Sequence, residues 1–318
     1  MSTPSTSLMS TPSATPAGTP SSADPTTHAL RHSGTQRDWA YPLMVFPAVF
    51  LFTVFLIIPT LVGVFFSFTS YGGFGEWHFV GLGNYIALFN DPNIWAPYGF
   101  TFFLAIVSVV LVNVLAMGIA LGLNANIKWR TPIRTIFFVP MVLSALVVAY
   151  VFTFLFNNTL PLIAQRTGIS SLATTLLADA STAWIPIGFV TAWTSIPGTT
   201  LIYLAGLQAV PKELYEAASV DGASTWRQFR SITMPLMAAY LIINIILGFR
   251  GYLSAYDIIV AMTAGGPGIS TMTVSMRIMG GLNGGDFAYQ AANSLVFFLI
   301  TLAISLVQLR VSRKGMTL

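Results

Sequence analysis

Six long apolar runs divide the chain, and short polar connections separate them. Each run has the roughly 20 residues that a helix needs to cross the hydrocarbon core of a bilayer. The fourth run is the weakest, because Pro186, Pro197 and Gly198 interrupt it, and the fifth carries Arg250. The pattern predicts an all-α polytopic membrane protein with six transmembrane helices, at about 43–68, 98–123, 134–156, 184–206, 236–257 and 288–309.

The composition excludes a soluble enzyme. Only 8% of the residues are charged and 55% are hydrophobic, whereas about a quarter of the residues of an ordinary soluble domain are charged. Residues 1–36 differ, because they are mostly Ser, Thr, Pro, Ala and Gly and cannot bury enough apolar surface to fold. We therefore expect a disordered cytoplasmic tail over 1–36, followed by one six-span domain over 37–318.

The basic residues indicate how the chain is oriented. Lys and Arg collect in short cytoplasmic loops, and here they lie on alternate connections. The opposite loops hold only two basic residues beside several acids. The chain is thus predicted to be a multi-pass protein of the cytoplasmic (inner) cell membrane, surrounded by lipid, with both termini cytoplasmic. This placement also accounts for the net charge of +4 without a nucleic-acid partner. The residues on the predicted inner side are Arg31, Arg37, Lys128, Arg130, Arg134, Lys212, Arg227, Arg230, Arg310, Arg313 and Lys314, and those on the outer side are Arg166, Arg277, Glu76, Asp91, Asp179 and Asp286.

The residues that catalysis or metal binding would need are missing. There is no Cys, and no Lys follows a Gly as it must in a P-loop. Of the three His, His28 and His32 lie in the tail and His78 lies in a loop, so none lies on a predicted helix that could supply a metal site. Asp257 is the one acid at the edge of a span, whereas acid–base chemistry or proton coupling would call for acids placed together or inside spans. We expect no enzyme activity, no metal and no cofactor, and a proton-coupled secondary transporter fits poorly.

The connection between the fourth and fifth runs carries helix signals of its own. Pro211 suits the first turn of a helix, and Lys212–Val220 is rich in helix formers. Gly222 suits the C-terminal end of that helix, and Ser224 could cap a second short helix that Pro235 would end. The sequence thus predicts a cytoplasmic helix–turn–helix bracket below the membrane.

One face of the first short helix is suited to a partner. Glu213, Glu216 and Val220 share that face by their spacing, and Ala217 and Ala218 are small enough to permit close approach. An ordinary interfacial loop is an equally acceptable interpretation on physical grounds alone.

The connection at about 206–235 resembles the EAA loop of ABC importer permeases. It contains Glu216-Ala217-Ala218, then Gly222, then Ile232-Thr233-Met234-Pro235, in which Met234 replaces the Leu of the family pattern. Further segments are similar to the maltose-type, binding-protein-dependent carbohydrate subfamily. They are Leu204 to Gln208 with Val210-Pro211, Asp221-Gly222-Ala223-Ser224 with Trp226, Tyr256-Asp257 with Thr263 and Gly265-Gly266-Pro267, and Phe79 to Tyr85.

The resemblance implies a transmembrane permease subunit of an ATP-driven sugar importer that forms half of the translocation pathway. It implies a second permease subunit, two ATPase subunits that each receive an EAA loop, and an extracytoplasmic sugar-binding protein that delivers the sugar. Carried over by position, the ATPase-coupling residues are Glu216, Ala217, Ala218, Asp221 and Gly222.

Two comparisons narrow the substrate class that the resemblance implies. Permeases for polyamines, phosphonates or amino acids share the loop, but the Gly265-Gly266-Pro267 context argues against them. The larger maltose-specific relatives have extra N-terminal spans and a folded outer domain that this chain lacks, so maltose itself is not implied.

Candidates for the substrate path come from polar residues in and near the fifth run. Such groups are costly in a membrane and usually face a cavity or a partner. The alternatives for Arg250 are snorkelling to the interface or pairing with Asp257. The predicted path residues are Asn244, Arg250, Tyr252, Tyr256 and Asp257, with Asn113, Asn293 and Gln290 as weaker candidates.

Overall fold

The computed structural model describes residues 40–125 and 128–315, and the predicted tail at 1–36 lies outside this range. The described residues are helical, apart from turns and an isolated β-bridge between Thr69 and Phe79. In chain order the elements are α1 (Ala40–Phe52), η1 (Thr53–Ile57), α2 (Ile58–Phe66), α3 (Gly83–Asn90), α4 (Trp95–Asn124), α5 (Arg130–Val142), α6 (Ala145–Phe154), η2 (Leu155–Thr159), α7 (Leu160–Thr167), η3 (Ser170–Leu172), η4 (Leu176–Ala178), α8 (Trp184–Ala209), α9 (Lys212–Val220), α10 (Thr225–Gln228), η5 (Phe229–Thr233), α11 (Met234–Leu253), α12 (Asp257–Thr263), α13 (Val274–Asn283) and α14 (Phe287–Gly315).

Six helices in the described ranges are long and apolar enough to cross a membrane, which confirms the predicted fold class. The chain divides into two compact units at Thr53; α1 belongs to the first, and α2 to α14 belong to the second. The six candidate spans are Leu43–Phe66, Trp95–Asn124, Ala145–Thr167, Trp184–Ala209, Thr225–Leu253 and Phe287–Ser312.

The third apolar run does not form one helix, so the boundary predicted at 134–156 is wrong. Helix α5 ends at Val142, because Leu143 is extended with ψ of 143°. Pro140 lies near that end, and a proline inside a helix removes a backbone donor and crowds the preceding turn. The helix of membrane-spanning length starts at Ala145 and continues through Asn157 and Asn158.

The fifth span starts earlier than predicted, and Pro235 does not end a separate helix. Helix α10 runs through η5 into α11 without a break. Pro235 has no N–H, and its ring crowds the carbonyl four residues earlier. The π-helical turn of η5, at Phe229–Thr233, lies directly before it and accommodates this mismatch.

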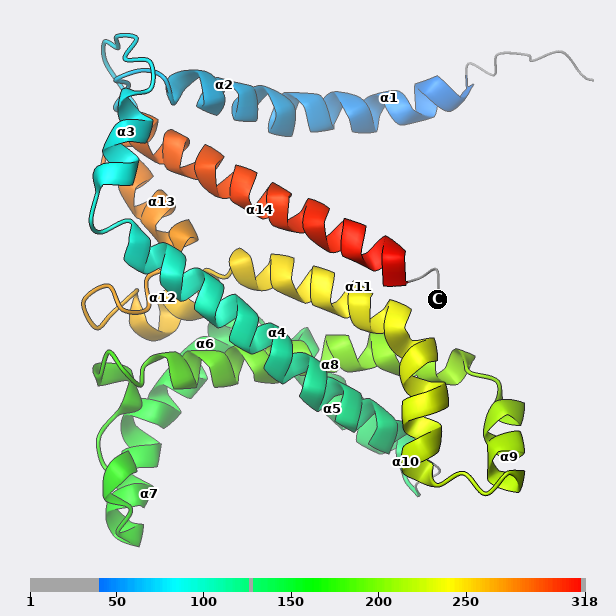
Figure 1. Ribbon diagram of the computed structural model, residues 1–318. Helices are drawn as coiled ribbons and strands as arrows, with labels where there is room; N and C mark the ends of the chain where they lie inside the picture. Colours follow the sequence, from blue (N-terminus) through cyan, green and yellow to red (C-terminus); the bar gives the residue numbers. More distant parts are fainter. Residues whose placement is uncertain (1–39, 126–127, 316–318) are drawn as a thin grey trace, which may run out of the picture. The chain divides into compact units, whose positions relative to one another are not determined.

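The core of the second unit is built around α4. Helix α4 packs along α8, and α11 packs against both (Figure 1). Their buried side chains meet in clusters that include Leu104 with Ile187 and Ala116 with Tyr203 and Met237. The same helices define two ends of this unit. We term the end where α4 and α8 finish and α10 begins the hairpin end, after the two short helices α9 and α10. The opposite end, which we term the far end, holds α3, α12 and α13.

Gly206 sets how closely α8 and α11 approach near the hairpin end. A Cβ at this position would lie 2.7 Å from Cγ and Cδ2 of Tyr240 and 2.9 Å from Cε of Met237. Only glycine leaves room for these side chains in their present positions, because Cβ contacts below 3.0 Å require something to shift.

We predict that Gly206→Ala destabilises the folded chain, by about 1–3 kcal/mol as is usual for overpacking. Gly198→Ala in the same helix is the matched control, because its Cβ would meet nothing within 4 Å. The measurement is the thermal unfolding midpoint of each purified variant in detergent. Equal midpoints for the two variants would show that the crossing at Gly206 is not tightly packed.

Candidate functional site

Helix α9 ends in a Schellman motif that explains the glycine after it. Gly222 has φ of +73°, a left-handed conformation that side chains rarely adopt. The Gly222 N–H donates to the Ser219 carbonyl (3.1 Å), and the Ala223 N–H donates to the Ala218 carbonyl (2.9 Å). Ser224 then caps α10, where its hydroxyl accepts from the Arg227 N–H. The turn predicted between two helices is therefore present.

Side chains of the following helix hold α9 in place. The Gln228 Nε2 donates to the Ser219 Oγ (2.9 Å) and to the Ala223 carbonyl (3.2 Å). At the other end of α9, the Tyr215 hydroxyl is hydrogen-bonded to the Thr233 hydroxyl (2.9 Å). These bonds make α9, its turn, α10 and η5 one connected piece. We term residues 211–233 the coupling hairpin, after the role that the sequence resemblance implies for them.

The coupling hairpin presents its predicted face to the outside. Glu213, Glu216 and Val220 are all exposed, while Tyr215 and Ala218 on the opposite face are half-buried. Val220, at the end of this face, is 89% exposed. The exposed surface thus combines carboxylates with an apolar tip, and it lacks a partner among the described residues.

A cavity of about 580 Å³ separates the coupling hairpin from the ends of α4 and α8. Trp226 stacks on Phe229 at its edge, with ring centroids 5.5 Å apart. The cavity lies at the hairpin end and is mostly apolar. Its lining residues are Leu121, Asn124, Ala125, Leu207, Tyr215, Thr225, Trp226, Gln228, Phe229 and Thr233.

A second cavity, of about 420 Å³, lies between α11 and α14. We term it the α11–α14 groove. Arg250 is exposed in it, and none of the described residues that line it is acidic. The guanidinium therefore has hydrogen-bond donors available inside a membrane-spanning region. The groove is lined by Phe249, Arg250, Leu253, Ser254, Ile278, Ser294, Phe297, Phe298, Thr301, Leu302, Ser305 and Gln308.

Helix α14 contributes a polar stripe to this groove. Ser294, Thr301, Ser305 and Gln308 recur at spacings of seven, four and three residues, which places them on one helix face. The hydroxyls of Ser294, Thr301 and Ser305 donate to carbonyls of their own helix at 2.8–2.9 Å. Their oxygens still have lone pairs to accept hydrogen bonds from a ligand.

The other predicted path residues lie in different surroundings. Asn244 is buried, and its Nδ2 donates to the Thr199 carbonyl (3.3 Å) between α11 and α8. Tyr252 is buried in the core, Tyr256 is half-buried and Asp257 is exposed at the start of α12. Of the five residues predicted for the path, the structure brings only Arg250 into the α11–α14 groove.

The weaker candidates are buried in helix contacts. Asn113 accepts from the Tyr203 hydroxyl, which joins α4 to α8. At the far end, Asn293 accepts from the Tyr98 hydroxyl (2.9 Å) and donates to Gln290 Oε1 (3.2 Å). Each of these amides is hydrogen-bonded inside the bundle, as polar groups in an apolar interior must be.

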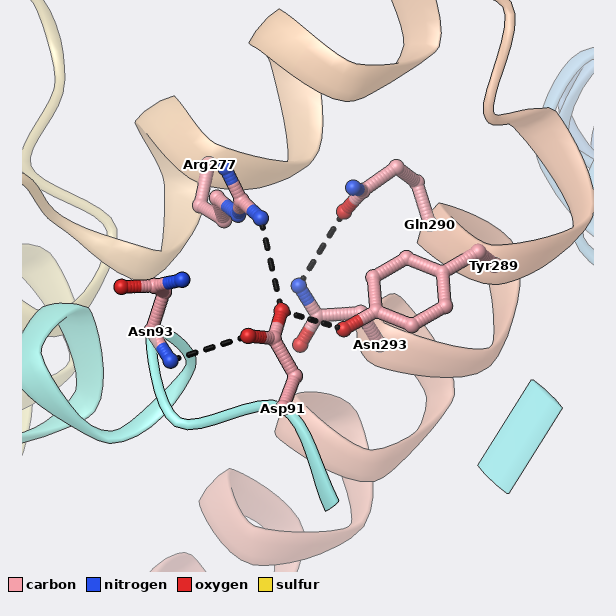
Figure 2. Close-up of polar contacts among 6 residues, drawn as sticks. All are labelled: Asp91, Asn93, Arg277, Tyr289, Gln290 and Asn293. Atoms are coloured by element: carbon pink, nitrogen blue, oxygen red, sulfur yellow. Dashed lines mark hydrogen bonds and ion pairs between the residues drawn. The ribbon is translucent and has the colours of Figure 1, made fainter. Parts of the chain in front are cut away.

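A polar cluster at the far end joins segments that are distant in sequence (Figure 2). Asp91, in the turn between α3 and α4, lies 3.5 Å from the Arg277 Nη2 of α13. The Tyr289 hydroxyl of α14 donates to the same Asp91 oxygen (3.0 Å), and the Asn93 N–H donates to the other (2.9 Å). The Asn93 N–H, then Tyr289 and Arg277, lower the pKa of Asp91, so its carboxylate is held in the charged form.

Sequence reasoning missed three parts of these sites. Asp91 and Arg277 were noted only as outer-loop charges, because no local pattern signals a contact between residues so far apart in sequence. The bonds from Tyr215 and Gln228 likewise depend on the fold. The stripe on α14 had a signal, because its polar residues recur at helical spacing within an apolar run.

Comparisons with known proteins agree with the fold and the hairpin motif. Residues 113–314 match the family described as "Binding-protein-dependent transport system inner membrane component". The multiple sugar-binding transport system permease protein MsmF of Streptococcus mutans is 34% identical over 278 residues, covering 87% of this chain and 96% of that protein. The trehalose/maltose transport system permease protein MalF of Thermococcus litoralis is 34% identical over 275 residues, covering 85% of this chain and 92% of that protein.

A solved structure shares the fold. It is a chain from a bacterial ABC transporter involved in the import of the acidic polysaccharide alginate, with a TM-score of 0.77 and 21% identity. The match covers 87% of this chain and 96% of that one. At this level of identity the likeness concerns the fold.

Proposed function

Because the chain belongs to the family of inner membrane components of binding-protein-dependent transport systems, we propose that an ATPase subunit contacts and moves its coupling hairpin. We also propose that the sugar passes along its α11–α14 groove. The chain is the multi-pass permease component of an ABC importer for sugars and is not itself catalytic. The carbohydrate-permease resemblance found in the sequence is thereby confirmed.

The exposed face of α9 is the observation that carries the proposal for coupling. Glu216 and Val220 project from a helix that Gln228 and Tyr215 fasten to the start of the fifth span. A push on this face would pass through α10 and η5 into α11, because the helix is continuous. Glu216, Ala217, Ala218, Asp221 and Gly222 form the contact with an ATPase subunit in this proposal.

The hairpin end faces the cytoplasm in this account, and both termini lie on the same side. The support is the alternation of basic residues, with Lys212, Arg227 and Arg230 on the coupling hairpin. The far end then faces the sugar-binding protein, and the Gly-rich segment at 265–268 lies there between α12 and α13.

The α11–α14 groove is the part of the sugar path that this subunit would supply. The α14 stripe from Ser294 to Gln308 covers about 21 Å at 1.5 Å per residue, most of the depth of a bilayer core. Hydroxyls, an amide and the Arg250 guanidinium along it match the hydrogen-bonding groups of a sugar. A second permease subunit would close the open side, and two ATPase subunits would complete the importer.

We predict that Gly222→Val uncouples transport while leaving the chain inserted in the membrane. Valine is strained at φ of +73°, and its Cβ would meet nothing within 4 Å, so the effect must come from the backbone. A shift of the hairpin should reduce labelled-sugar uptake by the assembled importer in proteoliposomes by about tenfold or more, as small displacements of a working geometry can.

Gly222→Asn is the control for this experiment, because asparagine tolerates the left-handed conformation. It should keep most of the uptake and the sugar-stimulated ATP hydrolysis. Co-purification of the ATPase subunits checks assembly. Normal coupled transport by Gly222→Val would remove the coupling hairpin from the proposal.

We predict that Arg250→Met lowers sugar uptake about tenfold or more, because it removes charged donors from the groove. Arg250→Lys should be intermediate, since lysine keeps the charge and loses the planar fork that binds two oxygens together. Uptake in proteoliposomes is the measurement, at equal amounts of assembled importer. If both variants transport like the native chain, Arg250 only snorkels and the α11–α14 groove is not the path.

A further inference from the structure

We propose that Asp91 is a positioning residue that holds α13 over the far end of the α11–α14 groove, and that release of Arg277 from Asp91 opens that end. The inference rests on the proposed role of the groove as the sugar path. It concerns the cluster of Asp91, Arg277 and Tyr289, which we term the Asp91 clasp (Figure 2).

Helix α13 is placed so that its position controls the groove. Ile278 of α13 lines the groove together with Arg250, Ser254 and Ser294, all near the far ends of α11 and α14. Arg277, the residue before Ile278, is the one that reaches Asp91. A backbone shift of α13 at Arg277 also moves Ile278, because the two are consecutive residues of one helix.

Contacts other than the Asp91 clasp hold the two ends of α13. The Val274 N–H donates to the buried Thr101 Oγ1 (3.0 Å), and the Val274 side chain is buried in a core cluster. At the other end, Gly281 packs so closely on Gln290 that a Cβ there would collide with its side-chain amide. The Asp91 clasp sets the orientation of the stretch between these ends, which carries Arg277 and Ile278. A turn of this stretch would move Ile278 at the end of the groove.

The Asp91 clasp opposes this turn through side chains that water reaches. The Arg277 and Asp91 side chains are 37% and 21% exposed, and the ion pair is 3.5 Å long. Partly solvated pairs of this kind contribute little stability and are easily broken. By contrast, the Tyr98–Asn293–Gln290 bonds that join α4 to α14 are buried. The far end thus combines a fixed pair of helices with a weakly held one.

Arg277 is also incompletely paired in the clasp. Its Nε is buried and has no hydrogen-bond partner among the described residues. A buried donor without a partner raises the energy of the arrangement. A turn of α13 that exposes this atom to water or to a partner would recover that energy.

Residues with positive φ lie in the connections on both sides of α13. They are Ala264, Gly265 and Gly268 before it and Gly285 after it. Loop residues next to a helix are where backbone angles change when that helix moves. The Gly-rich segment before α13 is also the part of this end proposed to lie near the sugar-binding protein, so a contact there could act directly on the Asp91 clasp.

The test uses Asp91→Asn in the assembled importer. Asparagine can still accept from the Asn93 N–H, and it removes the charge that attracts Arg277. We expect hydrogen–deuterium exchange of the α13 amides to rise severalfold. We also expect ATP hydrolysis without binding protein to rise, so that its stimulation by sugar-loaded binding protein falls at least twofold. Tyr289→Phe removes one bond without changing charge, and it should shift both measurements in the same direction.

Asp179→Asn is the matched control. Asp179 lies in another outer-side connection, and among the described residues its carboxylate accepts only from Ser181 in its own turn. Bonds from the Ser181 hydroxyl and N–H lower its pKa, as partners lower that of Asp91. It should leave both measurements unchanged. The double variant Asp91→Asn with Arg277→Gln should resemble the stronger single variant, because both remove the same contact.

The outcomes separate the clasp from the path. Faster exchange in α13 with native ATP hydrolysis would make the clasp a structural tie and overturn the gating role. Native values of both measurements in Asp91→Asn and in Tyr289→Phe would overturn the positioning role itself. If the groove is not the path, both Arg250 variants transport normally whatever α13 does.

Discussion

The absence of water inside a bilayer is the constraint on which the rest of this structure depends. Every backbone N–H and C=O group in a span must be hydrogen-bonded within the protein, and a helix forms all of these bonds within one segment. The same constraint acts on side chains, so a polar group in a span must be bonded to another or face a cavity. Asn113 is bonded to Tyr203, and Asn293 is bonded to Tyr98. Arg250 and the stripe on α14 instead face the α11–α14 groove, so the surroundings of a polar side chain separate the packing residues from the candidates for the sugar path.

The two ends of the bundle are built for different mechanical tasks. At the hairpin end, a Schellman turn and the bonds of Gln228 and Tyr215 connect α9 to a helix that continues into the fifth span. That arrangement suits transmission of force, since it has no flexible joint between the contact face and the membrane helix. At the far end, a partly solvated ion pair adds to the buried contacts of α13 and positions the stretch that lines the groove. An ion pair that water reaches is easily broken, which suits the proposed gating.

Much of the fold could be predicted from sequence, because apolar run length is a property of consecutive residues. The spans around Trp95–Asn124, Trp184–Ala209 and Phe287–Ser312 fall within a few residues of their predicted positions. Pro140 and Pro235 caused the errors in the third and fifth spans, since a proline can end a helix or be accommodated by a π-turn, and neighbours decide which. The hairpin turn was predictable from Gly222 and Ser224. The Asp91 clasp was not, because its partners lie in separate parts of the chain and meet only after folding.

The central claim, that α9 is the element on which an ATPase acts, can be tested by cross-linking. The chain has no cysteine, so Glu216→Cys creates a single thiol on the exposed face of α9. In the assembled importer, a short bifunctional reagent should join this position to the ATPase subunit, with a yield that changes when ATP binds. A thiol placed by Asp179→Cys should give no such product. The account is contradicted if position 216 does not cross-link to the ATPase, or if a reagent added from outside sealed cells modifies it.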